Sequence, residues 1–181
     1  LAEKGVKLTY LPFVIKAIAL ALKHHPVLNA ELDMDKERII YKNYINMGIA
    51  MDTEDGLVVP VIHAADTKSL TELASEIKSL ADRARDRKLS LEDLKDGTFS
   101  ITSYGSIGGY FAVPVIAYPQ VAIFGIGKIS QKPVIKDNQI VIGNVMPISM
   151  SVDHRIVDGA EVSRFVNEVL GCLKEPMQMM L

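Results

Sequence analysis

Hydrophobic residues follow two different periods along the chain, and these periods predict an alternation of helices and strands. Residues 11–25, "LPFVIKAIALALKHH", carry apolar side chains on nearly every side except a stripe formed by Lys16 and Lys23. Pro12 suits the first turn of a helix, where its missing N–H does no harm, and Pro26 ends the run. The pattern predicts a largely buried helix over residues 11–25.

Three further helices are predicted from their first residues and their periodicity. Ser69 and Glu72 form the capping-box pattern that begins a helix over residues 69–87. A short acidic helix is predicted over residues 90–97, because a serine stands at its start. A last amphipathic run predicts a helix over residues 159–173.

The other apolar runs predict strands, because they alternate or are short and rich in β-branched residues. In the run "TFSITS", Phe99 and Ile101 point to one face, whereas Thr98, Ser100 and Thr102 point to the other. The mixture of elements predicts an α+β fold in which helices cover one face of a mixed sheet. The predicted strands are 38–42, 45–53, 57–62, 98–103, 121–130, 132–136, 139–142 and 146–153.

Composition narrows the class of protein. The 181 residues suffice for one domain with a continuous core, and 20 basic against 22 acidic residues disfavour a nucleic-acid interface or a polybasic membrane anchor. Apolar residues make up 49%, yet the longest run, 11–22, is too short to span a bilayer. We expect the excess apolar surface to form subunit contacts. A lone cysteine, Cys172, excludes an internal disulfide and suits a reducing compartment.

The stretch "SMSVDHRIVDGAEVSRF", residues 149–165, holds the main candidate for chemistry. By strand alternation His154 continues an apolar face, so its ring is expected to be partly dry and neutral, the form that a general base needs. A histidine that only fills the core is the alternative. Asp158 and Glu161 form a D-x-x-E pattern typical of a helix N-cap, and Asp158 could also hold Arg155.

Other candidate sites are weaker. The glycine loop "SYGSIGGYF" is not followed by a helix, so we expect a turn and not a phosphate site. His24 and His25 lie at the end of the first predicted helix, where the helix dipole favours a cation. His63 has no other candidate ligand or catalytic residue near it in the sequence. Because no H-x-x-x-H, C-x-x-C or carboxylate cluster occurs, a metal site is not expected.

The segment "DHRIVDG" resembles the D-H-R-x-x-D-G motif of the dihydrolipoyl acyltransferases, the core components of 2-oxo acid dehydrogenase complexes. Other segments resemble that family in the same order, among them "LTYLPFVIKAIALAL", "HPVLNAELD", "LKDGTFSITSYGSIGG" and "PVIAYPQVAIFGIGKI". "GTFSITSYGSIGG" and "GIAMDTEDGL" are most similar to the branched-chain type. The resemblance covers residues 1–181 and implies one acyltransferase catalytic domain.

The resemblance implies a chloramphenicol-acetyltransferase-like fold and a homotrimer whose active-site channel lies between two subunits. Trimers would build a cubic or dodecahedral shell through the C-terminal tail "EPMQMML", residues 175–181, with burial against the same subunit as the alternative. The expected partners are decarboxylase and dihydrolipoamide dehydrogenase components, and neither nucleic acid nor membrane is expected.

Some expectations concern parts outside this chain. An N-terminal arm and upstream lipoyl and subunit-binding domains are expected to be absent from it, so the lipoyl group would be carried elsewhere. The resemblance further implies a prokaryotic cytoplasmic location, with the mitochondrial matrix as the alternative.

Family roles transfer to matching positions. The resemblance makes His154 the general base and Thr102, 52 residues earlier, the oxyanion donor from a neighbouring subunit. Ser100 is the competitor of Thr102. Asp158 completes the catalytic motif, as a cap and brace and not a proton carrier. One family contact falls on Ala81, which leaves that interaction in doubt. The implied coenzyme A contacts are Thr9, Asp52, Ser103, Gly127 and Ile129.

The implied reaction moves an acyl group from acyl-dihydrolipoamide to coenzyme A, without a metal. Two alternatives are a coenzyme-A-dependent O-acetyltransferase of the same fold and a non-catalytic scaffold component of the same assembly. The first would carry a second histidine where this chain has Asp153, and the second would lack His154 or Thr102.

Overall fold

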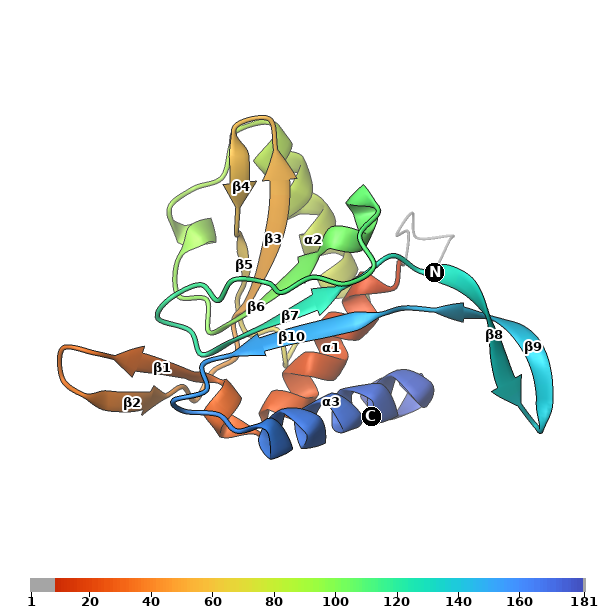
Figure 1. The fold of residues 1–181 in the computed structure, drawn as a ribbon. Coiled ribbons are helices and arrows are strands. Elements are labelled where there is room, and N and C mark those ends of the chain that lie inside the picture. Colours follow the sequence, from red (N-terminus) through yellow and green to blue (C-terminus); the bar gives the residue numbers. More distant parts are fainter. Residues whose placement is uncertain (1–8, 181) are drawn as a thin grey trace.

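A computed structural model describes residues 9–180 of the chain. Three α-helices and four short 3-10 segments alternate with ten strands (Figure 1). The helices are α1 (Leu11–Leu22), α2 (Leu70–Arg85) and α3 (Gly159–Lys174), and the 3-10 segments are η2 (Pro26–Leu28), η3 (Glu92–Leu94), η4 (Tyr104–Ile107) and η5 (Pro176–Met180). The strands are β1 (Ala30–Asp33), β2 (Arg38–Tyr41), β3 (Met47–Thr53), β4 (Gly56–Val58), β5 (Val61–Ile62), β6 (Phe99–Ser103), β7 (Ala122–Ile126), β8 (Ser130–Lys136), β9 (Gln139–Val145) and β10 (Ile148–Val152).

The main sheet is mixed. Its order is β10-β7-β6-β3-β4, with β5 also paired to β3. Strand β6 runs parallel to both β3 and β7, whereas β10 is antiparallel to β7. Two separate ribbons, β1–β2 and β8–β9, project from this body in Figure 1. The prediction of an α+β fold with a mixed sheet is confirmed.

The two faces of the sheet differ in chemistry. Phe99 and Ile101 of β6 are buried in the core, which also contains the buried side of α1. The opposite face carries small and polar residues: a Cβ added to Gly48 would lie 3.0 Å from the Ser100 hydroxyl. The alternation predicted for residues 98–103 is therefore confirmed, and it places Thr102 on the face opposite Phe99 and Ile101.

The first helix departs from its prediction at two points. Helix α1 ends at Leu22, so His24 and His25 lie beyond it. Lys16 does not belong to an exposed stripe, because it is only 9% exposed. Its ammonium group donates to the carbonyl oxygens of Asp66 and Lys68, at 2.7 and 2.8 Å. These bonds satisfy the buried charge, and burial lowers the pKa of Lys16.

Several strand boundaries also differ from the prediction. Strand β1 was not predicted, because its four residues, "AELD", are short and half polar. The predicted strand 57–62 is interrupted before β5, where Pro60 has no N–H to donate. The predicted strand 121–130 ends at Ile126, and the acidic helix predicted over 90–97 is only the single turn η3.

The C-terminal tail packs partly on its own subunit. Met179 is 5% exposed and joins the core, whereas Met177 is 72% exposed. The alternative of burial against the same subunit thus holds for Met179. Leu181 lies outside the described residues, and the role of the tail between trimers stays a prediction.

Candidate functional site

His154 lies in a turn that connects β10 to α3. The backbone N–H of Asp153 donates to the carbonyl of Val121 at 2.8 Å, and the N–H groups of Ile156 and Val157 donate to the Asp153 carbonyl, each at 3.0 Å. The Val157 side chain is buried in the core. Both sides of the turn are therefore fixed, while its middle carries His154 toward solvent.

The exposure of His154 corrects the prediction of a partly dry ring. Strand β10 ends at Val152, so the alternation that was extended to residue 154 no longer applies there. The imidazole is exposed in the single chain, and within residues 9–180 it has no hydrogen-bond partner. Desolvation of this ring would have to come from another subunit.

Arg155 pairs with Asp153 and not with Asp158. Its Nε and Nη2 donate to the two carboxylate oxygens of Asp153 at 2.9 and 2.6 Å. These bonds hold the pKa of Asp153 below its usual value, so the carboxylate stays charged at neutral pH. The predicted brace between Asp158 and Arg155 is wrong, because the adjacent carboxylate already occupies the guanidinium.

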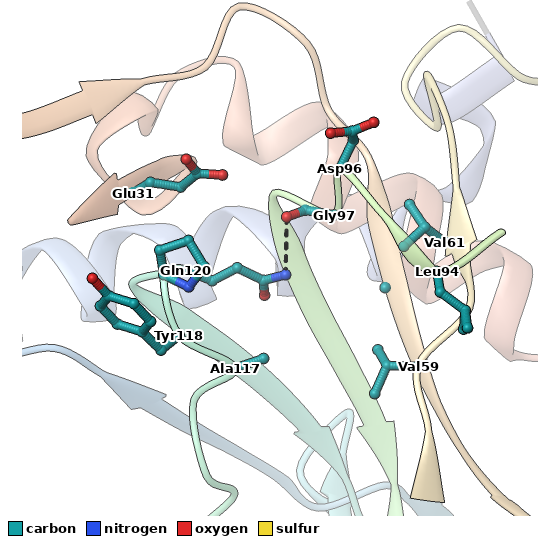
Figure 2. A pocket seen from close by; sticks show the side chains of 11 residues that line it. Glu31, Val59, Val61, Leu94, Asp96, Gly97, Ala117, Tyr118 and Gln120 are labelled. Carbon is teal, nitrogen blue, oxygen red and sulfur yellow. Dashed lines mark hydrogen bonds between the residues drawn. The ribbon is translucent and has the colours of Figure 1, made fainter. Parts of the chain in front are cut away.

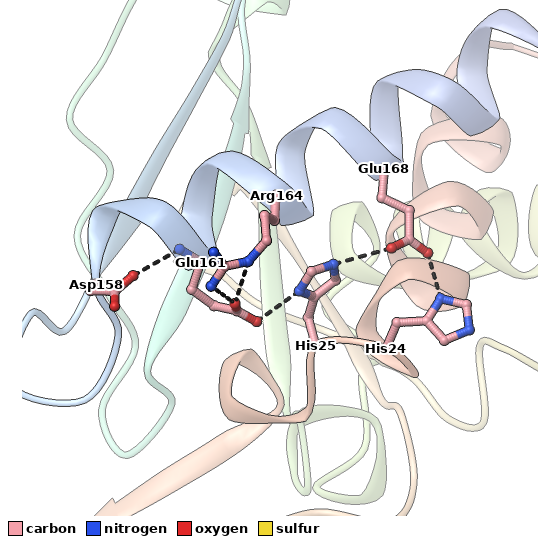
Figure 3. A network of polar contacts seen from close by, with 6 residues as sticks. All are labelled: His24, His25, Asp158, Glu161, Arg164 and Glu168. Atoms are coloured by element: carbon pink, nitrogen blue, oxygen red, sulfur yellow. Dashed lines mark hydrogen bonds and ion pairs between the residues drawn. The ribbon is translucent and has the colours of Figure 1, made fainter.

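Asp158 is the N-cap of α3, as predicted. Its Oδ1 accepts from the backbone N–H of Glu161 at 2.8 Å, and its own backbone is extended. The Glu161 carboxylate does not return the bond to the cap; it contacts His25 and Arg164 instead (Figure 3). Asp158 therefore supports the turn that carries His154.

A pair of variants tests this role of Asp158. Asp158→Ala removes the oxygen that caps α3 and is expected to lower the free energy of unfolding by about 1 kcal/mol. Asp158→Asn keeps a cap oxygen and should stay within about 0.5 kcal/mol of the wild type. Denaturant unfolding of both variants measures this difference. Equal losses for alanine and asparagine would contradict the capping role.

Thr102 lines a cavity of about 540 Å³ near the end of the sheet. The walls come from the ends of β3 and β6, from η4 and from one side of α2. Thr102 is partly buried, and its hydroxyl has no hydrogen-bond partner within residues 9–180. Ser100 instead donates to the Gln120 side-chain oxygen at 2.7 Å and is buried. Within the described residues the hydroxyl of Thr102 is thus free and that of Ser100 is not, and the choice of Thr102 as oxyanion donor stays a prediction.

The cavity gathers only part of the predicted coenzyme A contacts. Asp52 and Ser103 line it together with Thr102. Ala81 lies in the same wall, but its methyl group offers no hydrogen bond. The other three positions are not among the lining residues. Thr9 and Ile129 are exposed, and Gly127 is buried. Thr9 precedes Tyr10, whose hydroxyl lies 3.5 Å from the Ser103 hydroxyl.

Tyr104 fixes η4 against the sheet. Its hydroxyl donates to the Ser149 hydroxyl at 2.9 Å, and its ring crosses β7 at Gly125. A Cβ at Gly125 would lie 2.7 Å from a ring carbon of Tyr104, so only glycine permits this approach. The glycine loop therefore forms the turn η4, as predicted, and Tyr104 holds it against the sheet.

His154 and Thr102 lie at opposite ends of the sheet. Thr102 is in register with Gly125 on β7, which faces Ser149 on β10. From Ser149, β10 continues for three more residues, about 10 Å, and the turn that carries His154 follows beyond its end. Two side chains so placed cannot act on one small group within a single chain.

A second cavity, of about 290 Å³, lies beside the segments that lead into β6 and β7 (Figure 2). The side chain of Gln120 makes two hydrogen bonds beside this cavity. Its amide oxygen accepts from the Ser100 hydroxyl, and its amide nitrogen donates to the Gly97 carbonyl at 3.0 Å. Glu31 and Asp96 also line the cavity. No local sequence pattern predicts this cavity, because its walls come from five separate segments.

Sequence analysis also missed the partners of the two adjacent histidines. His24 and His25 both reach Glu168 on α3, with ring nitrogen to carboxylate distances of 2.6 and 3.1 Å (Figure 3). The prediction assumed that both residues belong to the first helix, where neighbours point apart. Since α1 ends at Leu22, the chain turns and lets both rings face one carboxylate.

Residues 9–180 contain neither a membrane-spanning helix nor a group of side chains that could hold a metal ion. No helix among them is long and apolar enough to cross a membrane. No group of three or more histidine, cysteine or acidic side chains in this part of the chain is arranged to hold a metal ion. The expectation of a metal-free reaction stays a prediction.

Comparison with known proteins identifies relatives over the whole chain. Residues 1–181 match the family described as 2-oxoacid dehydrogenases acyltransferase (catalytic domain). The acetyltransferase component of the pyruvate dehydrogenase complex from Acholeplasma laidlawii is 48% identical over 100% of this chain, and that from Bacillus subtilis is 45% identical over 99%. The chain spans 34% and 41% of their lengths.

Solved structures agree with this comparison. The dihydrolipoamide acetyltransferase of Azotobacter vinelandii has a TM-score of 0.93 and 40% identity, over 99% of this chain and 74% of that one. The cubic core of a pyruvate dehydrogenase multienzyme complex has a TM-score of 0.93 and 39% identity, with the same coverage. A chloramphenicol acetyltransferase, at 18% identity and a TM-score of 0.59 over 92% of this chain and 78% of that one, shares the fold alone.

These relatives correct the expected subtype. The named components and cores belong to pyruvate dehydrogenase complexes, so the branched-chain type finds no support among them. The chloramphenicol-acetyltransferase-like fold is confirmed. With a family match over its full length, the chain belongs to the family of 2-oxoacid dehydrogenase acyltransferase catalytic domains.

Proposed function

We propose that the chain transfers an acetyl group from acetyl-dihydrolipoamide to coenzyme A and forms the core of a pyruvate dehydrogenase complex. The observation that carries this proposal is the free Thr102 hydroxyl in the cavity, 52 residues before the exposed His154. Relatives that are 45–48% identical are acetyltransferase components of such complexes. Coenzyme A acts as a substrate, and the lipoyl group is carried outside this chain.

The spacing of the polar residues supports these roles. The study of the Azotobacter vinelandii enzyme examines a serine, a histidine and an asparagine in its catalytic mechanism, and the serine precedes the histidine by 52 positions. The asparagine follows that histidine by four positions. Thr102 and Asp158 have the same two offsets from His154. Threonine keeps the hydroxyl of serine, and aspartate, like asparagine, is a preferred N-cap.

The distance between His154 and Thr102 favours an active site shared by two subunits. The free end of β10 in one chain would bring His154 to the cavity of its neighbour, where Thr102 lies. We therefore infer a homotrimer with three such sites, in which the neighbour also covers the exposed imidazole. This arrangement would supply the partly dry environment that the single chain lacks.

In the proposed mechanism, neutral His154 removes the thiol proton of coenzyme A as sulfur attacks the acetyl carbonyl carbon. Thiols titrate near 8.5 and imidazoles near 6.5, so complete transfer beforehand would cost about 2–3 kcal/mol, and coupling it to attack lowers this cost. The Thr102 hydroxyl donates to the oxyanion of the tetrahedral intermediate. Cleavage of the older carbon–sulfur bond releases the dihydrolipoamide sulfur, which recovers the proton from His154.

Two observations disfavour the alternatives. An O-acetyltransferase of this fold would carry a second histidine at position 153, but Asp153 occupies it and is held by Arg155. A non-catalytic scaffold would not need a free hydroxyl beside a cavity, whereas this chain retains both Thr102 and His154. Acyl transfer therefore remains the function that best fits the site.

An assay with two acyl donors tests the proposal. We expect kcat/KM for acetyl-dihydrolipoamide to exceed that for isobutyryl-dihydrolipoamide by at least about tenfold, because two extra methyl groups must fit a site built for acetyl. Coenzyme A consumption by the assembled protein gives both values. Absence of transfer with either donor would refute the reaction, and preference for isobutyryl would refute only the acetyl assignment.

Assembly and location are further parts of the proposal. The relative whose cubic core has been solved supports a shell of trimers, and the exposed Met177 offers one contact for the tail between them. Decarboxylase and dihydrolipoamide dehydrogenase components would complete the complex that the relatives' names describe. A prokaryotic cytoplasm is the proposed location, with the mitochondrial matrix as the alternative.

A further inference from the structure

A buried histidine holds the first turns of the helix that follows His154. His25 lies just beyond α1, and its side chain is 9% exposed. Its Nδ1 is 2.7 Å from a carboxylate oxygen of Glu161, and its Nε2 is 3.1 Å from one of Glu168 (Figure 3). The edge of its ring meets Phe165, at a centroid distance of 5.6 Å. The ring is thus fixed on both polar sides and on one apolar side.

The two contacts determine the protonation state that the site requires. Carboxylates only accept hydrogen bonds, and a neutral imidazole has one N–H, so it can satisfy only one of the two carboxylates. An imidazolium has two N–H groups and satisfies both. Arg164 also donates to the Glu161 carboxylate, and His24 contacts the other carboxylate oxygen of Glu168, so the argument for the imidazolium rests on the two nitrogen contacts of His25.

Glu161 connects this contact to the turn that carries His154. While its carboxylate binds His25, its backbone N–H donates to Asp158, the N-cap. The hydrogen bonds of the Asp153 carbonyl hold the other side of the turn against the sheet. Movement at the start of α3 therefore displaces Asp158, and Asp158 is four residues from His154.

We propose that His25, as an imidazolium, is a positioning residue for His154, acting through Glu161 and the N-cap of α3. This inference rests on the proposed acyl transfer. His25 touches neither substrate nor the reacting atoms. It fixes the place at which the turn leaves the sheet, and small displacements of a catalytic base cost much of its effect.

The proposal predicts a pH dependence on the acid side. Hydrogen bonds from His25 and then from Arg164 hold the pKa of Glu161 below its usual value, so this carboxylate loses its partners only in acid. The contact is therefore present at neutral pH and is lost as the pH falls through the lowered pKa of Glu161. The charged and titratable groups around the ring are Glu161, Arg164 and Glu168 on α3 and His24 beside it, with Cys172 beyond Glu168.

His25→Gln tests the inference, with His24→Gln as the matched control. His24 contacts the same Glu168, but its side chain is 72% exposed and does not touch Glu161. We expect His25→Gln to lower kcat by about 10- to 100-fold with little change in KM for coenzyme A, and His24→Gln to stay within about twofold. The wild-type kcat should also fall in acid more steeply than that of His25→Gln, because only the wild type depends on the charged contact of His25 with Glu161. Ionisation of the substrates affects both proteins equally.

Each other outcome has a distinct meaning. A His25→Gln protein with a lower melting temperature but unchanged kcat and pH profile would overturn the positioning role and leave only a structural one. If His25→Gln does not fold, Glu161→Gln replaces it, since it keeps the backbone cap while removing the charge that pairs with His25. An unchanged kcat for a folded Glu161→Gln would likewise overturn the inference. An inactive wild type would refute the proposed function instead.

Discussion

Replacement of His154 by alanine is expected to lower kcat for acyl transfer by about 10³- to 10⁴-fold, the largest effect of any single substitution in this chain. The neighbouring carboxylate cannot replace the imidazole as a base, because the hydrogen bonds from Arg155 hold the pKa of Asp153 below its usual value. Steady-state assays with acetyl-dihydrolipoamide and coenzyme A measure the loss. A variant that kept a tenth of the wild-type rate would remove His154 from the mechanism.

This substitution is expected to change the reaction rate without changing the stability of the subunit. The His154 ring is exposed and has no hydrogen bond within residues 9–180, so its removal should leave the melting temperature of the subunit nearly unchanged. KM for coenzyme A should change little, because His154 acts on the proton and not on the nucleotide. His63→Ala, which removes another exposed histidine far along the chain, is a suitable control and should retain full activity.

Local patterns predicted the parts of the site that depend on local geometry. Alternation along "TFSITS" placed Thr102 on the face opposite Phe99, and D-x-x-E identified Asp158 as a cap; both predictions are confirmed. Alternation failed at His154 because the strand ends two residues earlier. Strand alternation predicts the direction of a side chain only within the strand. The end of β10 depends on its pairing with β7, and no local pattern predicts that pairing.

Contacts between segments that are distant in the chain cannot be predicted from local patterns in a single sequence. His25 and Glu161 are separated by 136 positions, and neither histidine nor glutamate at a helix end is unusual. Strand β1 is held by β2 and by the segment before β7 and has almost no apolar signal of its own. In both cases tertiary pairing stabilises what local preference leaves undecided. The cavity near Thr102 has the same origin, since its walls come from β3, β6, η4 and α2.

Thr102→Ala is expected to lower kcat by about 10²- to 10³-fold while substrate binding changes little, because the hydroxyl donates to an oxyanion that exists only during the reaction. Thr102→Ser keeps the donor and should retain most of the activity. Ser100→Ala is the matched control on the same face of β6, and since Ser100 is bound to Gln120 it should affect stability more than kcat. Full activity of Thr102→Ala would refute the oxyanion role.

Mixing the two inactive variants tests whether each site draws on two chains. If His154 of one subunit meets Thr102 of its neighbour, a trimer containing both His154→Ala and Thr102→Ala subunits has one site with both groups present. Random co-assembly in equal amounts should therefore restore about one quarter of the wild-type activity, although each variant alone is nearly inactive. Two groups that worked within one chain would give a mixture as inactive as its components. Because the register places these residues at opposite ends of the sheet, we expect activity to return.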